Sequence, residues 1–144
     1  QLKTGNLFET KCGIIAHGVN CRNGFGSGVA GQIARLFPLA KEHYHLKYKH
    51  PGWKLGDVQF VFCPQRIIAN CATQDNYGRS GVFVDYDAVA SCLTKLFEYA
   101  ESVNTGVAMT RIGCGLAGGN YEVVSNIIQQ CQQGKNVYVE VWEL

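Results

Sequence analysis

The chain has 144 residues, which is the length of about one domain. Hydrophobic residues make up 47% and charged residues 17% of the chain, fractions that are typical of a globular protein and exclude a disordered tail. The net charge of +2 is too small for the clustered basic surface that a dedicated nucleic-acid binder usually carries. No apolar run reaches the roughly 18 residues of a membrane span, and the N-terminus lacks the layout of a signal peptide.

Hydrophobic periodicity predicts strands that alternate with helices, which is typical of an α/β layered fold. The first expected strand is the apolar run 13–19, and two helices follow it, 28–37 and 38–49, the second opening on Pro38. No repeat or linker interrupts the chain, so we expect a single domain over 1–144. The remaining predicted elements are strands 58–63 and 67–73 joined by a tight turn at Pro64-Gln65, helix 85–101, strand 107–112, helix 121–131 and strand 137–144.

Seven cysteines occur at irregular spacing, and none forms a CxxC pair. This pattern argues against a zinc ribbon and against a thioredoxin-type redox motif. We therefore expect reduced core thiols in a cytosolic protein, and neither a metal nor a cofactor.

Glycine is the unusual residue type in this composition. Eight of the 17 glycines fall in two short segments, 24–31 and 113–119, and each segment follows a predicted strand and precedes a predicted helix. Backbone N–H groups at a helix N-terminus favour an anion such as a phosphate, and glycine lets the anion approach closely. Either segment alone is explained as well by a tight turn. Two of them in matched contexts indicate a diphosphate held from two sides.

A dinucleotide-binding fold is the remote alternative, because Gly26, Gly28 and Gly31 satisfy the GxGxxG pattern. An NAD-dependent oxidoreductase of that fold also needs an acidic residue at the end of the next strand, to bind the ribose hydroxyls. Here that strand ends in Phe62-Cys63-Pro64. A P-loop is excluded because no Lys-Ser or Lys-Thr follows a glycine in the required pattern.

Four stretches together resemble a macro domain: Gly5-Asn6-Leu7, 15–20 (IAHGVN), 24–28 (GFGSG) and 112–119 (IGCGLAGG). They occur in the family's order and cover almost the whole chain. Residues 17–21 also resemble the His-x-x-Asn-Cys stretch of the compact group of ADP-ribose-1″-phosphate processing proteins, which has phage and yeast forms. The resemblance implies a three-layer α/β/α sandwich with a mixed sheet of roughly six strands, and ADP-ribose in a cleft across the strand ends.

The resemblance also implies a binding site, residue by residue. Asn6 falls on the adenine-reading position, where many members have Asp, so an uncharged acceptor there predicts a lower affinity. Ile15 and Ala16 would flank the base, Asn20 would meet the distal ribose, and the two glycine loops would hold the diphosphate. The full set of expected ADP-ribose-binding residues is Asn6, Leu7, Ile15, Ala16, Asn20, Gly24, Gly26, Ser27, Gly28, Val29, Gln74, Gly113, Cys114, Gly115, Leu116, Ala117 and Tyr121.

The expected catalytic residues are His17 and Asn20. Histidine has an unperturbed pKa near neutrality, so His17 would act as a general acid or base and donate to the terminal phosphate or leaving oxygen. Asn20 would position the distal ribose or a water. The alternatives are a hydrogen-bonded histidine inside the sheet and a turn-capping asparagine. Residues i and i+3 of a strand point to opposite faces, so a shared role requires the strand to end or bulge between them, and we expect this at Gly18.

Three smaller regions carry weaker signals. His43 and His45 belong to a run of histidines and lysines over 41–54, but their i,i+2 spacing places them on different helix faces, so we expect a solvated basic helix and no metal site. Asp85 is expected to cap the helix that follows it. Arg79, in a Gly/Ser loop, is expected to cover the distal ribose.

Some related macro domains remove ADP-ribose from glutamate with a lysine and an aspartate. Their aspartate aligns with Ala117, and no lysine lies near Gln74, so that covalent route is in doubt. Two functions remain: hydrolysis at C1″ of ADP-ribose-1″-phosphate or an ADP-ribosyl adduct, which we favour, and a non-catalytic reader of ADP-ribose. The expected partners are ADP-ribose or ADP-ribose-1″-phosphate, with ADP-ribosylated macromolecules as a further class. We expect a monomer that does not bind membranes, in the cytoplasm, or in the host cytoplasm if a phage encodes it.

Overall fold

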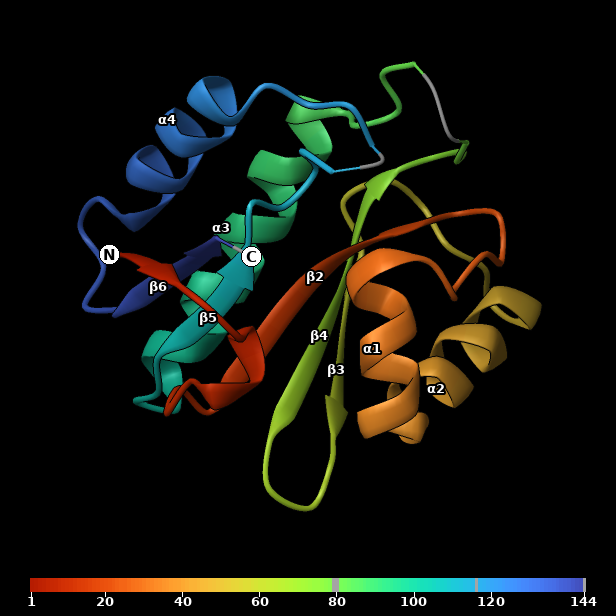
Figure 1. The fold of residues 1–144 in the computed structure, drawn as a ribbon, viewed down its shortest axis with the longest axis horizontal. Coiled ribbons are helices and arrows are strands. Elements are labelled where there is room, and N and C mark those ends of the chain that lie inside the picture. The colour runs from red at the N-terminus through yellow and green to blue at the C-terminus, as the bar shows by residue number, and fades with distance from the viewer. Residues whose placement is uncertain (79–80, 116, 144) are drawn as a thin grey trace.

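The computed structural model describes residues 1–78, 81–115 and 117–143. Within these residues six strands form one mixed sheet in the order β1-β6-β5-β2-β4-β3 (Figure 1). Only the pairing of β3 with β4 is antiparallel. The strands are β1 (Leu2–Thr4), β2 (Ile14–Asn20), β3 (Val58–Phe62), β4 (Ile67–Gln74), β5 (Val107–Thr110) and β6 (Val139–Glu143). The helices are η1 (Leu7–Glu9, a 3₁₀ turn), α1 (Gly28–Leu36), α2 (Pro38–Lys49), α3 (Tyr86–Ser102) and α4 (Tyr121–Gln132).

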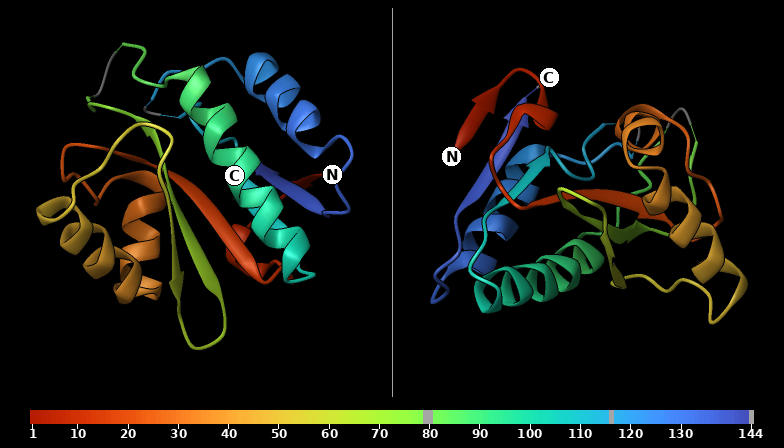
Figure 2. Two further views of the ribbon diagram at one scale, coloured as in Figure 1. Left: turned by 180° about the vertical axis from the view of Figure 1, so that it is seen from behind. Right: turned by 90° about the horizontal axis from the view of Figure 1, so that it is seen from below.

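Helices cover both faces of the sheet, as Figure 1 and the two views of Figure 2 show. On one face α3 and α4 pack against Ile14, Ala16 and other buried side chains. On the opposite face α1, α2 and η1 pack against Ile15 and Val19. The expected three-layer α/β/α sandwich is therefore confirmed.

The strand β2 lies in the middle of the sheet, between β4 and β5. It is buried on both faces, which explains why its sequence is a nearly continuous apolar run without alternation. All strands paired with β2 run parallel to it, so their carboxyl ends meet at one edge of the sheet. Both glycine segments leave the sheet at this edge, which is where ligands bind in open α/β sheets.

The predicted elements match the observed ones apart from their ends and two omissions, β1 and the single turn η1. The turn at Pro64-Gln65 closes the β3–β4 hairpin through two backbone hydrogen bonds between Cys63 and Arg66. The Asp85 side chain accepts a hydrogen bond from the Ala88 N–H and caps α3, as predicted. The pattern missed β1, because three half-exposed residues carry no periodicity; its pairing with β6 is what defines it.

All seven cysteine thiols are free, and four of them are buried. Within residues 1–78, 81–115 and 117–143, no helix is both long enough and apolar enough to cross a membrane.

Candidate functional site

A cavity of about 940 Å³ lies between the two glycine segments, above the carboxyl ends of β2, β4 and β5. Its described lining contains neither a carboxylate nor a lysine. The lining residues are His17, Gly18, Val19, Asn20, Gly24, Phe25, Gly26, Ser27, Gly28, Val29, Ala30, Gln32, Gln74, Tyr77, Gly78, Thr110, Arg111, Ile112, Gly113, Gly115 and Ala117.

The first glycine loop, residues 21–27, is organised by the side chain of Asn20. The Nδ2 group of Asn20 donates to the Gly24 carbonyl at 2.8 Å, and Oδ1 accepts from the N–H groups of Arg22 and Gly24. The Tyr44 hydroxyl donates to the same Oδ1 at 3.0 Å and to the Asn20 carbonyl at 2.6 Å. The amide oxygen of Asn20 therefore anchors the loop to α2, which is the turn-capping role considered above.

The first loop ends at the N-terminus of α1. Ser27 is the N-cap residue, but its side chain makes no capping hydrogen bond. The first-turn N–H groups of a helix have no intrahelical acceptor, so here they face the cavity without a side-chain partner. Gly28 opens the helix at φ +56°, a conformation that favours glycine. This arrangement is suited to bind a phosphate.

The second glycine loop, described over residues 111–115 and 117–120, is held by its own backbone. The Gly119 N–H donates to the Gly113 carbonyl at 2.8 Å, and the Cys114 N–H donates to the Arg111 carbonyl at 3.0 Å. The Ala117 carbonyl accepts hydrogen bonds from the N–H groups of Phe83 and Val84, which ties the loop to the segment that precedes α3.

Two kinds of glycine line the cavity. A Cβ atom added at Gly26 or Gly115 would meet nothing within 4 Å, so these positions leave open space for a ligand. A Cβ atom at Gly113 would lie 2.6 Å from Val84 Cγ2, and one at Gly18 would lie 2.5 Å from Thr73 Oγ1. Gly113 and Gly18 are thus required for packing, whereas Gly26 and Gly115 are required for access.

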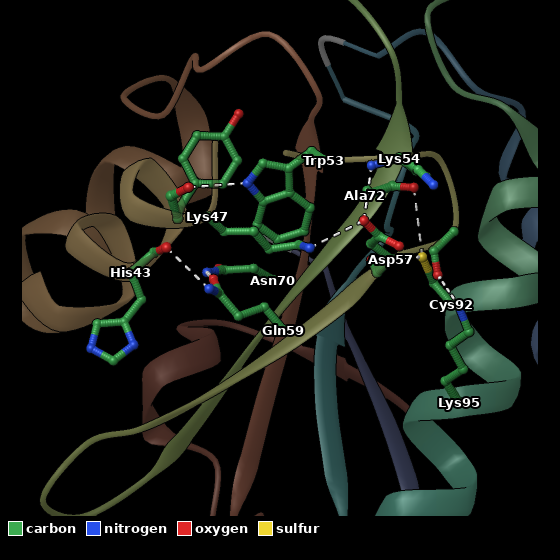
Figure 3. Close-up of polar contacts among 12 residues, drawn as sticks. His43, Lys47, Trp53, Lys54, Asp57, Gln59, Asn70, Ala72, Cys92 and Lys95 are labelled. Carbon is green, nitrogen blue, oxygen red and sulfur yellow. Dashed lines mark hydrogen bonds and ion pairs between the residues drawn. The ribbon is translucent and has the colours of Figure 1, made fainter. Parts of the chain in front are cut away.

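His17 lies at the floor of the cavity with 2% of its surface exposed. Its Nε2 is 2.6 Å from Asn70 Oδ1, and its ring packs edge-on against Phe25. The Nδ2 group of Asn70 donates to the Ala40 carbonyl and to Gln59 Oε1, so Oδ1 is the atom that faces His17 (Figure 3 shows Asn70, Gln59 and His43). Nε2 therefore carries the proton, and Nδ1 is left as a buried lone pair without a partner among the described residues.

Burial lowers the pKa of His17 to about 4, although the hydrogen bond with Asn70 raises it. A neutral imidazole with its proton directed at Asn70 has no proton to give at Nδ1. The neutral ring thus offers an acceptor at Nδ1, and the expected donation from His17 to a phosphate or leaving oxygen, which stays a prediction, would require protonation of a group whose pKa is lowered. The physical reason is desolvation, which the sequence pattern did not reveal.

The irregularity expected between His17 and Asn20 exists, but it is not at Gly18. Gly18 pairs in register with Cys71, and the register shifts between Val19 and Asn20, so that Asn20 pairs with Gln74. Gly18 is required instead because Thr73 lies against it. The shift lets Asn20 turn toward α2 while His17 stays in the sheet.

The cavity brings together eleven of the sequence-predicted site residues, and six others lie elsewhere. Asn6 is exposed and caps η1 through a hydrogen bond from the Phe8 N–H, and Leu7, Ile15 and Ala16 are buried in the core. The Cys114 thiol donates to the Ile112 carbonyl. The Arg111 guanidinium carbon lies over the Tyr121 ring, 4.7 Å from the centroid of that ring. Leu116 and Arg79 lie outside the described residues. The eleven are His17, Asn20, Gly24, Gly26, Ser27, Gly28, Val29, Gln74, Gly113, Gly115 and Ala117.

Sequence reasoning missed two side chains of the lining that carry chemistry. Tyr77 lies in the loop after β4 with 56% of its surface exposed, and its ring is close to Gly24. Arg111 forms an ion pair with Glu143 at 3.0 Å. Neither belongs to a recognisable motif, although a tyrosine in a polar loop after a strand is a signal for a cavity rim.

Two known proteins are similar to this chain in sequence over most of its length. No protein-family model matches it. It is 30% identical over 139 residues to an uncharacterized 17.5 kDa protein of the tk-vs intergenic region of Enterobacteria phage T4, covering 90% of this chain and 86% of that protein. It is 26% identical over 167 residues to the ADP-ribose 1″-phosphate phosphatase of the yeast Meyerozyma guilliermondii, covering 94% of this chain and 95% of that protein.

Solved structures share the fold. A protein of unknown function from Bacteroides thetaiotaomicron matches with a TM-score of 0.91 at 29% identity, covering 100% of this chain and 98% of that one. A macrodomain protein from Streptomyces coelicolor matches with a TM-score of 0.80 at 26% identity, covering 100% and 99%. Thermosipho africanus DarTG, solved in complex with ADP-ribose, shares the fold with a TM-score of 0.84 at 16% identity, over 98% of this chain and 41% of that one.

Proposed function

Because the chain belongs to the macro domain family, in the group with the phage and yeast relatives, we propose that its cavity binds ADP-ribose and hydrolyses a derivative at C1″ of the distal ribose. The preferred substrate is ADP-ribose-1″-phosphate, and ADP-ribosyl adducts of macromolecules form the second class. One observation carries the binding proposal: Gly26 and Gly115, from two separate loops, leave open space on the same cavity of about 940 Å³.

The electrostatics of the cavity support an anionic ligand. A diphosphate needs donors and an absence of negative charge, and the described lining offers the N-terminus of α1 and two loop backbones with no carboxylate. That the yeast relative is an ADP-ribose 1″-phosphate phosphatase supports the phosphate ester at C1″ as the bond that is hydrolysed.

The role that we assign to His17 is that of an acceptor for a water, and it requires the buried Nδ1 to become accessible from the cavity. A water that donates to Nδ1 would add its oxygen to the phosphorus atom while the bond from phosphorus to the C1″ oxygen breaks. The water proton would pass to Nδ1 and from there to solvent, the released C1″ oxygen would take a proton from solvent, and the products would be ADP-ribose and inorganic phosphate. A neutral imidazole is available for this role throughout the neutral pH range, because its pKa lies near 4.

Other chemistries find less support. A lysine–aspartate route has no lysine in the described lining, and Ala117 stands where the aspartate would be. For the oxidoreductase alternative, β3 runs antiparallel to β4, so the end of β3 lies at the edge of the sheet away from the glycine loops. No acidic group from that strand end can reach a ribose at the cavity.

Two measurements test the proposal. Titration calorimetry with ADP-ribose and with NADH should show binding of ADP-ribose alone, and NADH binding of equal strength would favour the oxidoreductase. Incubation with ADP-ribose-1″-phosphate should release phosphate. If ADP-ribose binds but no phosphate, acyl-ester or thymidine-linked substrate turns over, the protein is a reader and the enzyme proposal is lost.

A further inference from the structure

The small net charge of the chain conceals an uneven distribution of charge. Residues 35–54 carry five of the 13 basic side chains and three of the four histidines, but only one of the 11 acidic side chains, Glu42. The rest of the chain consequently has more acidic than basic residues. A basic segment on an otherwise acidic protein is the electrostatic footprint that a polyanion recognises.

The two sides of α2 use their basic residues differently. On one side Lys47 forms an ion pair with Asp57 at 3.3 Å and lies over the Trp53 ring, as Figure 3 shows for these three residues. That lysine is part of the packing of the loop 50–57. On the other side, Lys41 and Lys49 are exposed, and within the described part of the chain neither forms an ion pair.

Lys41, His45, Tyr48 and Lys49 form one stripe along α2, because residues four, seven and eight positions apart share a helix side. We refer to these four residues as the basic face of α2. Lys41 and Lys49 lie four residues before and four residues after His45, and burial and then their ammonium groups lower the pKa of His45. Tyr48, seven residues after Lys41 and next to Lys49, has 41% of its surface exposed.

The basic face of α2 adjoins the cavity through the first glycine loop. The His45 ring lies against the Asn23 side chain and 6.4 Å from the Phe25 ring, and Phe25 lines the cavity. Arg22, on the same loop, is exposed but paired with Asp75 at 2.8 Å, so its charge is already balanced. Lys41 and Lys49 have no such ion-pair partner among the described residues, and the acidic residue of α2, Glu42, is exposed beside Lys41.

We infer that the basic face of α2 binds single-stranded nucleic acid. Two free ammonium groups eight residues apart stand about 12 Å apart along the helix axis and contact the phosphate backbone. The exposed Tyr48 ring on the same helix side offers a flat surface on which an unpaired base stacks. An acidic peptide would use the lysines but gain little from the ring, and duplex DNA presents no unstacked base. The inference does not depend on binding of ADP-ribose in the cavity.

The test is the fluorescence anisotropy of a short labelled oligothymidylate over a series of salt concentrations. The Lys41→Gln/Lys49→Gln variant should bind at least about tenfold more weakly, and its slope of log affinity against log salt should fall by about 1.4, or about 0.7 for each lost phosphate contact. The Lys11→Gln/Lys135→Gln variant removes the same charge elsewhere and should bind like the unmodified protein. Tyr48→Ala should bind about fivefold more weakly or worse, whereas Tyr48→Phe should keep the affinity.

Four results would overturn the inference. The first is that the unmodified protein does not bind the oligothymidylate at low salt, and the second is that the two double-lysine variants lose affinity equally. The third is that poly-glutamate competes as strongly as unlabelled oligothymidylate, and the fourth is that a duplex binds more tightly than the single strand. All the substituted side chains lie outside the cavity lining, so phosphate release from ADP-ribose-1″-phosphate should be unchanged in each variant. A failure here is thus separable from a failure of the proposed function.

Discussion

The two glycine loops border the same cavity but are held in place by different means. The first depends on one side chain, Asn20, whose amide makes four hydrogen bonds. The second depends on main-chain hydrogen bonds and on Gly113 and Gly118, which adopt φ values of +78° and +77°. Similar glycine content therefore does not mean similar construction, and a substitution in one loop should fail differently from a substitution in the other.

The largest expected effect is that of Gly115→Glu. Its side chain would enter the open space of the cavity and add both volume and negative charge, so ADP-ribose binding should be lost while the protein stays folded. Calorimetry measures the binding, and circular dichroism confirms the fold. Gly115→Ala is the matched control and should retain binding, because its Cβ meets nothing within 4 Å. Full affinity in a folded Gly115→Glu protein would remove the second loop from the site.

His17→Ala should lower single-turnover phosphate release from ADP-ribose-1″-phosphate by about 10²–10⁴, since general base assistance is typically of that size. The affinity for ADP-ribose should change far less. Above pH 5 the rate in the unmodified protein should not rise through a histidine titration, because the pKa of His17 lies near 4. A rate that falls as pH rises through 6.5 would instead restore the acid role.

The same buried histidine predicts a pH dependence of stability. Its pKa is 6.5 in the unfolded chain and about 4 in the folded protein, so between these values the unfolded state binds more protons. The free energy of unfolding should therefore fall by about 3 kcal/mol as pH drops from 6.5 to 4, with no contribution from this group above 6.5. Urea unfolding of the unmodified protein and of His17→Gln at several pH values isolates the contribution of His17. Only the unmodified protein should lose roughly 3 kcal/mol of unfolding free energy at low pH. Parallel pH profiles for the two would contradict the burial of His17.

Asn20→Ala and Gly113→Ala are a matched pair for the two loops. The first removes the hydrogen bonds that hold the Gly24 backbone, and the second forces an alanine to φ +78° beside Val84. Each should lower the free energy of unfolding by about 1–3 kcal/mol, measured in urea. Hydrogen exchange should report the loss around Gly24 in the first variant and around Gly119 in the second. If both variants loosen the same loop, the loops are coupled and the comparison fails.

The smallest expected effect is at Asn6. One neutral hydrogen bond to the adenine edge is worth about 0.5–1.5 kcal/mol, so Asn6→Ala should weaken ADP-ribose roughly threefold to tenfold and leave ribose-5-phosphate unchanged. Asn6 also caps η1, and Asn6→Asp keeps an acceptor for the Phe8 N–H. Equal losses for both ligands, measured by calorimetry, would show that Asn6 supports only the local backbone.

Local patterns determined the elements and the approximate position of the site. The apolar run of β2, the stripe of α3 and the glycines at two strand ends are each readable within one short segment of sequence, and they predicted the layers and the two loops. The short strand β1 could not be predicted in this way, because it is defined by its pairing with β6 at the far end of the chain, where Leu2 lies opposite Val141.

Tertiary structure alone decided the chemistry of individual groups. The sequence places a histidine before a glycine loop, but the layer of α2 over β2 and β4 is what buries His17, directs its proton to Asn70 and lowers its pKa. The sequence likewise supplies lysines on both sides of α2, and only the packing of the loop 50–57 pairs Lys47 while Lys41 and Lys49 remain exposed. Burial and ion pairing depend on residues that are distant in the chain. The local sequence therefore does not determine which groups are protonated or which charges remain unpaired.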